Sequence, residues 1–482
     1  MKLHLNKCFS LALLGALATS VSGQAQKAPN VVFVLADEWR AQDVGYNGNK
    51  DVLTPNLDRL ATKGVNFTNT ISTCPVCCPY RASLLTGQYP LTTGVFVNDV
   101  QLNPKAQSLG KVFKASGYKT AYIGKWHIDG NGRNSFIPVE RRQGFDYWKV
   151  LECTHDYNNS FYWGSDDKKA KWKGYDAYAQ TADAVNYLKE RGKDEKPFLM
   201  VLSWGPPHTP FETAPESFKK IYREKLLKLR GNVPEALKQK ATEDLIGYYA
   251  HISALDSCIG VLQQSLKESG LDENTIFVFT SDHGAMVRSH GFVNKQRPYE
   301  ESISVPMLIR YPEVFGSKGK KNDMLIGTPD LMPTLLGLCG LPIPATVEGE
   351  DKSAIMKGKA KDKTEAVLIA SYHAFGQYSG ELGGKEYRGV RTKRYTYVKD
   401  LSGPWVLFDN QKDPFQLNNL VKDANHQIVM NELELKLAQL LTKNHDQFLP
   451  GMEYVKKWNY VIDKTGTVPY VKINYQGLPI NE

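Results

Sequence analysis

Apolar, β-branched runs alternate with amphipathic helical patterns through the N-terminal part of the chain, and this order constrains the fold most. The first run is Asn-Val-Val-Phe-Val-Leu-Ala from residue 30, and similar runs lie at 120–123, 197–203, 275–280 and 305–309. They are apolar throughout, as strands covered on both faces must be. Helical spacing of apolar residues lies between them, at 56–63, 108–115, 178–191 and 243–268. We therefore expect an α/β fold with a large, mostly parallel sheet sandwiched by helices.

The pattern changes after residue 360. Short strand-like runs with turn residues between them lie at 367–372, 387–392, 394–398 and 405–408, and an amphipathic helical pattern follows at 430–443. This indicates a small antiparallel sheet with one packed helix. A chain of 482 residues is too long for one ordinary core. We expect a catalytic α/β domain at 25–360 and a smaller C-terminal α+β subdomain at 361–482.

Residues 1–24 have the pattern of a secretory signal peptide. Lys2 and Lys7 form a basic start, residues 8–21 are largely apolar, and small residues precede Gln24. No other segment approaches 18 consecutive apolar residues. We expect an exported protein, periplasmic or secreted, without stable membrane insertion.

The charge balance favours anionic partners weakly. The chain carries 60 Lys and Arg against 51 Asp and Glu, a formal net charge of +9. Basic residues concentrate only at 218–240, which is typical either of a solvated helix face or of a surface that attracts a polyanion. No zinc-finger, homeodomain or RNA-binding motif accompanies them, so nucleic acid is not expected as a partner.

Acids, histidines and a lysine follow four of the apolar runs. The carboxyl ends of parallel strands meet at one edge of a sheet, where ligands bind. The residues that follow these runs are Asp37, Glu38, Lys125, His127, His208, Asp282 and His283. Three carboxylates and a histidine suit a hard divalent cation, and we favour Ca²⁺ over Mg²⁺ because Ca²⁺ accepts looser geometry.

The segment 74–87, Cys-Pro-Val-Cys-Cys-Pro-Tyr-Arg-Ala-Ser-Leu-Leu-Thr-Gly, is the most distinctive. Pro79 favours a first helical turn and Gly87 a helix end, so we predict a helix between them. Cys77 and Cys78 then lie at its N-terminus. Backbone N–H groups and the helix dipole there favour an anion and lower the pKa of a thiol.

This segment resembles the Cys-x-Pro-x-Arg…Thr-Gly signature of type I sulfatases, a family of the alkaline-phosphatase-like superfamily that includes secreted bacterial carbohydrate sulfatases. Only Cys77 has proline at +2 and arginine at +4. Further matching segments lie at 30–37, 124–127, 207–210, 280–284, 295–300 and 408–420.

The resemblance implies a nucleophile and a metal site. Cys77 would be oxidised to formylglycine (3-oxoalanine) by a formylglycine-generating maturation enzyme. Residue 77 would bind Ca²⁺ together with Asp37, Glu38, Asp282 and His283. The family often has a second aspartate where this chain has Glu38, and asparagine where it has His283.

The resemblance also implies roles for five further residues. Lys125 and Lys295 would bind the sulfate oxygens, and Arg81 would hold the formylglycine. His208 would assist the leaving alcohol, and His127 would help the second hydroxyl of the hydrated aldehyde to expel sulfate.

The expected substrate is a sulfated carbohydrate, with galactose or N-acetylgalactosamine sulfate favoured. The segment 155–163 combines aromatic and polar residues, so His155 and Asn158 are expected to contact sugar. Weaker expectations of sugar contact are Arg288, His290, His373 and Arg391. Which sugar and hydroxyl carry the sulfate, and whether action is endo or exo, stay open.

Two other functions stay open at this point. A phosphoester or phosphonate hydrolase of the same superfamily would usually have serine or threonine as nucleophile, often with two metals. A non-catalytic glycan-binding homologue would be expected to lack Cys77, His127 or His208, and all three are present.

Overall fold

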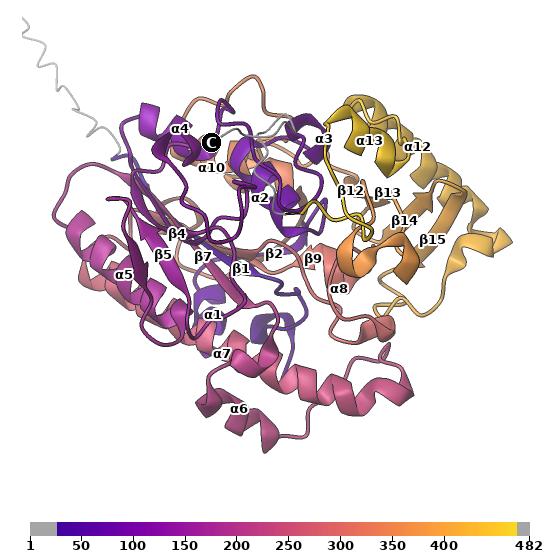
Figure 1. The fold of residues 1–482 in the computed structure, drawn as a ribbon, viewed down its shortest axis with the longest axis horizontal. Helices are drawn as coiled ribbons and strands as arrows, with labels where there is room; N and C mark the ends of the chain where they lie inside the picture. Colours follow the sequence, from indigo (N-terminus) through magenta and orange to yellow (C-terminus); the bar gives the residue numbers. More distant parts are fainter. Residues whose placement is uncertain (1–26, 470–482) are drawn as a thin grey trace, which may run out of the picture.

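The structure is a computed structural model that describes residues 27–469, so the expected signal peptide lies outside the described residues. The described part contains a mixed sheet of 11 strands and an antiparallel sheet of four strands (Figure 1). The larger sheet belongs to the N-terminal part of the chain and the smaller sheet to the C-terminal part. This confirms the predicted fold class.

The centre of the large sheet is parallel. Strand β1 (Asn30–Asp37) lies between β7 (Phe198–Pro207) and β8 (Thr275–Ser281), parallel to both. Strands β3 (Lys119–Lys125) and β4 (Tyr147–Leu151) continue the parallel order beyond β7. All eight residues of β1 are buried, because helices cover both faces of the sheet.

The edges of the large sheet are mixed. Strand β5 (Phe161–Gly164) is antiparallel to β4, and β6 (Lys169–Lys171) is antiparallel to β5 and closes one edge. Strands β2 (Val65–Ile71) and β11 (Lys320–Gly327) form the other edge.

The run expected as one strand at 305–309 is instead β9 (Ser304–Val305) and β10 (Met307–Arg310). Pro306 separates them because it has no N–H to donate to a sheet. Strand β10 is antiparallel to β2 and β8.

Alternate residues of β1 face two cores. Val31, Phe33 and Leu35 pack with one set of helices, which comprises α2 (Cys77–Thr86), α4 (Leu109–Ala115) and α10 (Leu331–Cys339). Val32, Val34 and Ala36 pack on the opposite face with α1 (Pro55–Ala61), α5 (Asp176–Arg191) and α7 (Lys238–Glu268) (Figure 1). Short helices elsewhere are α3 (Pro90–Thr93), α6 (Glu216–Arg223), α8 (Glu300–Ile303), α9 (Pro312–Phe315) and α11 (Ser353–Met356).

Helix α7 is the longest described helix. The helical segment 235–268 is long and apolar enough to cross a bilayer by composition, but 78% of its apolar window is buried inside the protein. It contributes Leu245, Ile252, Leu255 and Ile259 to the core beneath β1. Its apolar face is therefore accounted for by packing within this chain.

The small sheet has the order β12 (Val367–Ser371), β13 (Tyr387–Arg391), β14 (Tyr395–Asp400) and β15 (Gly403–Asp409). One face packs against α12 (Gln427–Lys443) through Leu433 and Leu437. The other face joins residues of the large sheet region, including Ile71 and Leu325.

After α13 (Gly451–Lys457) the chain returns to the large domain, where the Tyr460 hydroxyl donates to the Gly94 carbonyl at 2.9 Å. The predicted subdomain therefore contacts the region of the large sheet both along its own sheet and at its C-terminal end.

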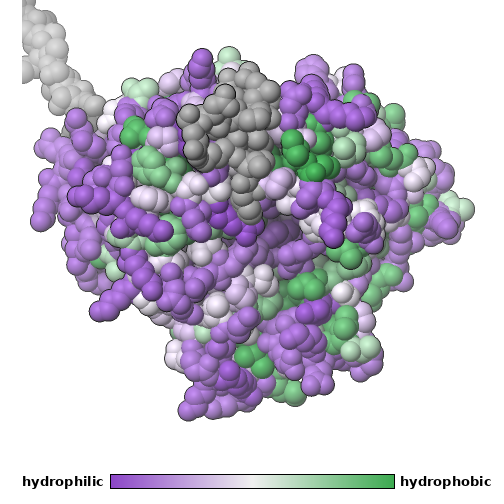
Figure 2. All heavy atoms as spheres, in the orientation of Figure 1, coloured by the Kyte–Doolittle hydropathy of each residue, from purple (hydrophilic) through white to green (hydrophobic). Residues whose placement is uncertain are grey.

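Several basic residues of the segment 218–240 pair with neighbouring acids. Lys219 and Arg223 pair with Glu216 on α6, and Arg230 pairs with the buried Glu301 at 2.7 Å. Figure 2 shows a mostly hydrophilic surface over this region, with apolar residues in small patches. These pairs favour the solvated-face interpretation over a polyanion-binding surface.

Candidate functional site

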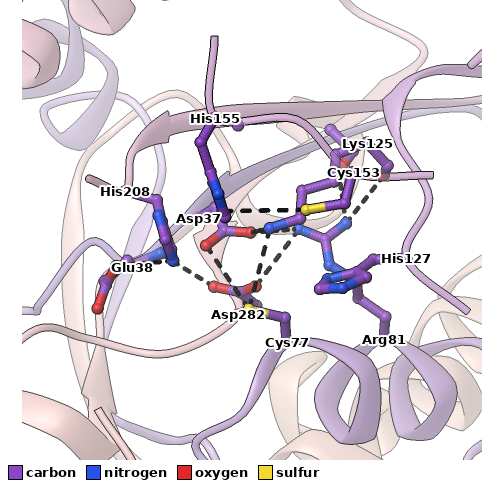
Figure 3. A network of polar contacts seen from close by, with 12 residues as sticks. Asp37, Glu38, Cys77, Arg81, Lys125, His127, Cys153, His155, His208 and Asp282 are labelled. Atoms are coloured by element: carbon purple, nitrogen blue, oxygen red, sulfur yellow. Dashed lines mark hydrogen bonds and ion pairs between the residues drawn. The ribbon is translucent and has the colours of Figure 1, made fainter. Parts of the chain in front are cut away.

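The carboxyl ends of β1, β3, β7 and β8 meet at one place, as predicted (Figure 3). Asp37 and Lys125 are the last residues of β1 and β3. His208 directly follows β7, and Asp282 directly follows β8. The parallel register thus gathers side chains that are up to 245 residues apart in sequence.

Cys77 is the first residue of α2 and points into this cluster (Figure 3). The helix begins two residues before the predicted Pro79, because the Tyr80 N–H already donates to the Val76 carbonyl at 3.0 Å. The sulfur of Cys77 lies 3.2 Å from Nε2 of His283. It lies 3.9 Å from both Asp37 Oδ1 and Lys125 Nζ.

Arg81, one turn further along α2, joins the two aspartates. Its Nη2 lies 2.9 Å from Asp37 Oδ2 and 3.3 Å from Asp282 Oδ2. Its Nη1 donates to the Lys125 carbonyl at 2.9 Å and to Ser203 Oγ at 2.7 Å. With 1% of Arg81 exposed, the guanidinium is a fixed internal counter-charge for both carboxylates.

Burial and neighbouring charges act in opposite directions on the adjacent acids. Burial alone would raise the pKa of Asp37, but the charges of Lys125, at 2.5 Å, and of Arg81 hold it well below its ordinary value. Burial raises the pKa of Glu38, although Lys295 and His283 oppose the rise.

Glu38 has a left-handed backbone with φ of 70°. Its Oε2 lies 3.2 Å from His208 Nε2 and 3.7 Å from Lys295 Nζ, whereas its Oε1 has no hydrogen-bond partner among the described residues. The 1% exposure of Glu38 leaves water no access to these oxygens. A buried carboxylate oxygen without a hydrogen-bond partner, such as Oε1, is what a bound cation would satisfy.

The donor atoms fit a divalent cation. Those of Asp37, Cys77, Asp282 and His283 all lie within 4.8 Å of one another. Glu38 falls in an adjoining group with Asp37 and His208, so Asp37 is common to both groups. All five predicted metal ligands therefore lie together, and their carboxylate-rich set suits Ca²⁺.

His208 contacts two other predicted residues, Lys295 and His155. Its Nε2 is 2.7 Å from Lys295 Nζ, and its Nδ1 is 2.7 Å from the Thr209 carbonyl. The ring of His155 stacks on it at 4.8 Å, with 4° between the planes. Burial and the charge of Lys295 hold the pKa of His208 well below its ordinary value, so His208 is neutral here and accepts from Lys295. Burial, with the charge of Lys125, also lowers the pKa of His155 to about 3.

Of the predicted sugar contacts, the structure brings only His155 to the cluster. Asn158 lies on the same loop and donates through Nδ2 to the Thr213 carbonyl at 3.0 Å. The side chain of Asn158 is exposed.

The remaining four predicted sugar contacts are engaged within the chain. Arg288 pairs with Asp244 at 2.6 Å, and Arg391 pairs with both oxygens of Glu300 at 2.7 and 3.1 Å. His290 stacks on Tyr299 at 4.2 Å. His373 Nε2 lies 3.1 Å from the Gly466 carbonyl. These contacts place them outside the cluster around Cys77.

The structure also places two residues at the site that the sequence analysis did not single out. Asp99 Oδ1 lies 3.1 Å from Nε2 of the predicted His127. Cys153 Sγ lies 4.0 Å from Nε2 of His155. The sequence signal for Asp99 is a polar Asn-Asp pair interrupting the apolar run at 95–100. Buried polar residues in an apolar run need partners, which is a reason to look for a site there.

Two family models match the chain: Sulfatase over residues 29–341, and N-sulphoglucosamine sulphohydrolase, C-terminal, over 288–443. An ulvan-active sulfatase of Formosa agariphila is 44% identical, covering 92% of this chain and 88% of that protein. An endo-4-O-sulfatase of Bacteroides thetaiotaomicron is 32% identical, covering 90% and 96%. A structure from work on glycosaminoglycan metabolism by Bacteroides thetaiotaomicron matches with a TM-score of 0.80 and 30% identity, covering 89% of this chain and 98% of that one.

Proposed function

This chain belongs to the sulfatase family, and from that premise we propose that it hydrolyses sulfate esters on carbohydrates with residue 77 as nucleophile. It is a sulfuric ester hydrolase with an alkaline-phosphatase-like fold. The observation that carries the proposal is the placement of Cys77. Its sulfur is buried at a helix N-terminus, among Asp37, Lys125 and His283.

We infer that Cys77 is converted to formylglycine by a maturation enzyme. A hydrated aldehyde supplies two hydroxyls, of which one can attack sulfur and the other can later drive release of sulfate. A serine at this position has no second hydroxyl to do this. The motif Cys77, Pro79 and Arg81 supports the modification.

We also infer that Ca²⁺ binds to Asp37, Glu38, Asp282, His283 and residue 77. When bound, Ca²⁺ would polarise the sulfate and neutralise charge that develops on its oxygens. Arg81 fixes two of these carboxylates, and the N–H groups of Glu38 and His283 donate to Asp282 Oδ1 at 3.0 and 2.9 Å. The metal ligands are thus held in place by the chain itself.

The chain's own cations and histidines complete the reaction. Lys125 enters the cluster from the end of β3 and Lys295 from the loop between β8 and α8, and they would bind sulfate oxygens between them. The leaving oxygen needs a proton, and His208, whose Nε2 lies 2.7 Å from Lys295 Nζ, is the residue that would deliver it. The stacked ring of His155 keeps His208 in its orientation.

The proposed substrate is a sulfated glycan or its oligosaccharides, including galactose or N-acetylgalactosamine sulfates. The relatives named above act on ulvan and on 4-O-sulfates according to their names. The loop of His155 and Asn158 borders the site and offers a ring and an exposed amide to a sugar. Export to the periplasm or beyond, as the leader predicts, would bring the enzyme to such polymers.

The phosphoester alternative has less support, because the nucleophile position holds cysteine, and a second metal would need ligands beyond those around residue 77. A non-catalytic homologue also has less support, because Cys77, His127 and His208 all lie at the site.

The first test is the mass of the peptide that contains Cys77, after coexpression with a maturation enzyme. Conversion of the thiol to an aldehyde should lower its mass by about 18 Da. The converted protein should then release sulfate from a panel of monosaccharide and oligosaccharide sulfates. An unchanged thiol despite a competent maturation system, or activity on phosphate esters alone, would refute the proposal.

Calcium should stabilise the wild-type chain. At a free concentration about 100 times Kd, bound Ca²⁺ raises the free energy of unfolding by about 2.7 kcal/mol. Asp282→Asn should lose most of that gain, because it removes a charged ligand. Asp409→Asn is the matched control, since Asp409 pairs with Arg394 in the small sheet. Thermal unfolding with calcium or a chelator gives the answer, and an equal calcium gain in both variants would contradict the assigned ligands.

A further inference from the structure

Asp99 is a buried carboxylate that faces the ring of His127. Its Oδ1 lies 3.1 Å from Nε2, and the two side chains are 4% and 3% exposed. Among the described residues, Nδ1 of His127 has no hydrogen-bond partner. One ring nitrogen is therefore held by a carboxylate, and the other is free.

This contact determines where the ring carries its hydrogen. An ionised carboxylate accepts hydrogen bonds and cannot donate one, so beside an ionised Asp99 the hydrogen of the ring would lie on Nε2. A neutral imidazole has a single N–H, so Nδ1 keeps its lone pair. The ring projects toward the cluster around Cys77 (Figure 3). Nδ1 is thus the nitrogen left to meet residue 77.

Asp99 is hydrogen-bonded to the helix that carries residue 77. Its backbone N–H donates to Cys78 Sγ at 3.3 Å, and the Asn98 side-chain oxygen accepts from the Cys78 N–H at 3.1 Å. Asp99 and His127 have φ of 65° and 60°, a left-handed conformation that such residues keep only when their contacts hold them. Cys78 therefore links the nucleophile helix to Asp99, and Asp99 links it to His127.

We propose that Asp99 is a positioning residue that fixes the Nε2–H tautomer of His127, so that Nδ1 is the base for release of sulfate. This inference rests on the proposed function. Nδ1 takes the proton of the free hydroxyl at residue 77, and the electrons of that O–H bond form the second bond of the carbonyl. The C–O bond to sulfate breaks, and sulfate leaves with its electron pair. The aldehyde is restored, and the step needs no oxidant or reductant.

The tautomer can be measured in the unmodified chain, independently of activity. Nitrogen-15 NMR of histidine-labelled protein should show Nε2 protonated and Nδ1 unprotonated for His127, assigned by loss of the signals in His127→Gln. In Asp99→Asn the amide can donate to Nε2, so hydrogen should move to Nδ1. A wild-type chain with hydrogen on Nδ1 would overturn the proposal, whether or not the chain hydrolyses any sulfate.

The mature enzyme provides the second readout. Asp99→Asn should lower kcat by about 10³-fold, since a carboxylate-to-amide change that upsets a histidine tautomer costs about 10⁴-fold in a serine protease triad. Because release alone slows, the peptide of residue 77 should carry an added sulfuryl group of about 80 Da during turnover.

The matched control is Asp256→Asn, a buried carboxylate that accepts from the Leu57 N–H of α1 at 2.8 Å. This variant should alter stability but leave the tautomer and kcat as in the wild type. A kcat for Asp99→Asn within about threefold of wild type would overturn the role of Asp99. An inactive wild-type chain would refute the proposed function instead, and the tautomer would still decide where Asp99 places the hydrogen.

Discussion

Cys77→Ala should lower kcat/KM for a sulfated sugar by about 10⁴- to 10⁶-fold, which is the range seen when an enzyme loses its nucleophile. Alanine removes the attacking group and one metal ligand, but leaves Asp37, Asp282 and Arg81 paired as before. Folding should therefore be retained. Sulfate release from the preferred sugar, measured beside the unfolding curve, separates the two effects.

Cys77→Ser separates transfer of the sulfuryl group to residue 77 from the later release of sulfate. A serine hydroxyl can accept the sulfuryl group, but no second hydroxyl is present to drive its release. We expect at most one sulfate transferred per chain, with no sulfate appearing in solution. Cys339→Ala is the thiol control, because Cys339 lies on α10, away from the cluster. Multiple turnovers by Cys77→Ser would contradict the mechanism.

The sequence predicted the sheet where the pattern was continuous. β1, β3, β7 and β8 are apolar on both faces, so both their existence and their parallel order followed from composition. Strand β2, with Val65, Phe67 and Ile71 alternating with polar residues, was missed, although its period of two was present. The antiparallel direction of β10 depends on pairing with β2 and β8, which no local pattern encodes.

The site residues that lie at the ends of strands could be predicted from the sequence. Asp37, Lys125, His208 and Asp282 follow apolar runs, and parallel pairing alone brings such positions together. Asp99 lies on a segment between helices, and its meeting with His127 depends on how that segment packs against α2.

Arg391 was predicted to contact sugar, but the structure pairs its side chain within the chain. A basic residue in a strand of a subdomain looks available to a substrate, but Nε and Nη2 of Arg391 donate to the two carboxylate oxygens of Glu300, which is distant in sequence. Ion pairs between segments far apart in sequence decide which charges are free, and sequence alone does not reveal them.

Arg81→Met should reduce the free energy of unfolding by about 3–5 kcal/mol in the presence of a chelator, because it leaves the buried carboxylates of Asp37 and Asp282 without the guanidinium that pairs with both. Asp37 keeps Lys125, but Asp282 loses the arginine with which it pairs. Bound Ca²⁺ would replace part of the missing charge, so the deficit should shrink in calcium. Urea unfolding of wild type and variant, with calcium and with a chelator, measures both quantities.

Arg394→Met provides the comparison, since Arg394 pairs with Asp409 but is 40% exposed. Exposed pairs contribute about 0–1 kcal/mol, so its loss should be small and independent of calcium. If Arg81→Met cost no more than Arg394→Met, the guanidinium would not be the counter-charge of the two aspartates. If its deficit were the same in calcium and in chelator, no cation would bind between them. The comparison of the two variants in chelator therefore tests the role of Arg81. The comparison of Arg81→Met in calcium and in chelator tests whether a metal binds.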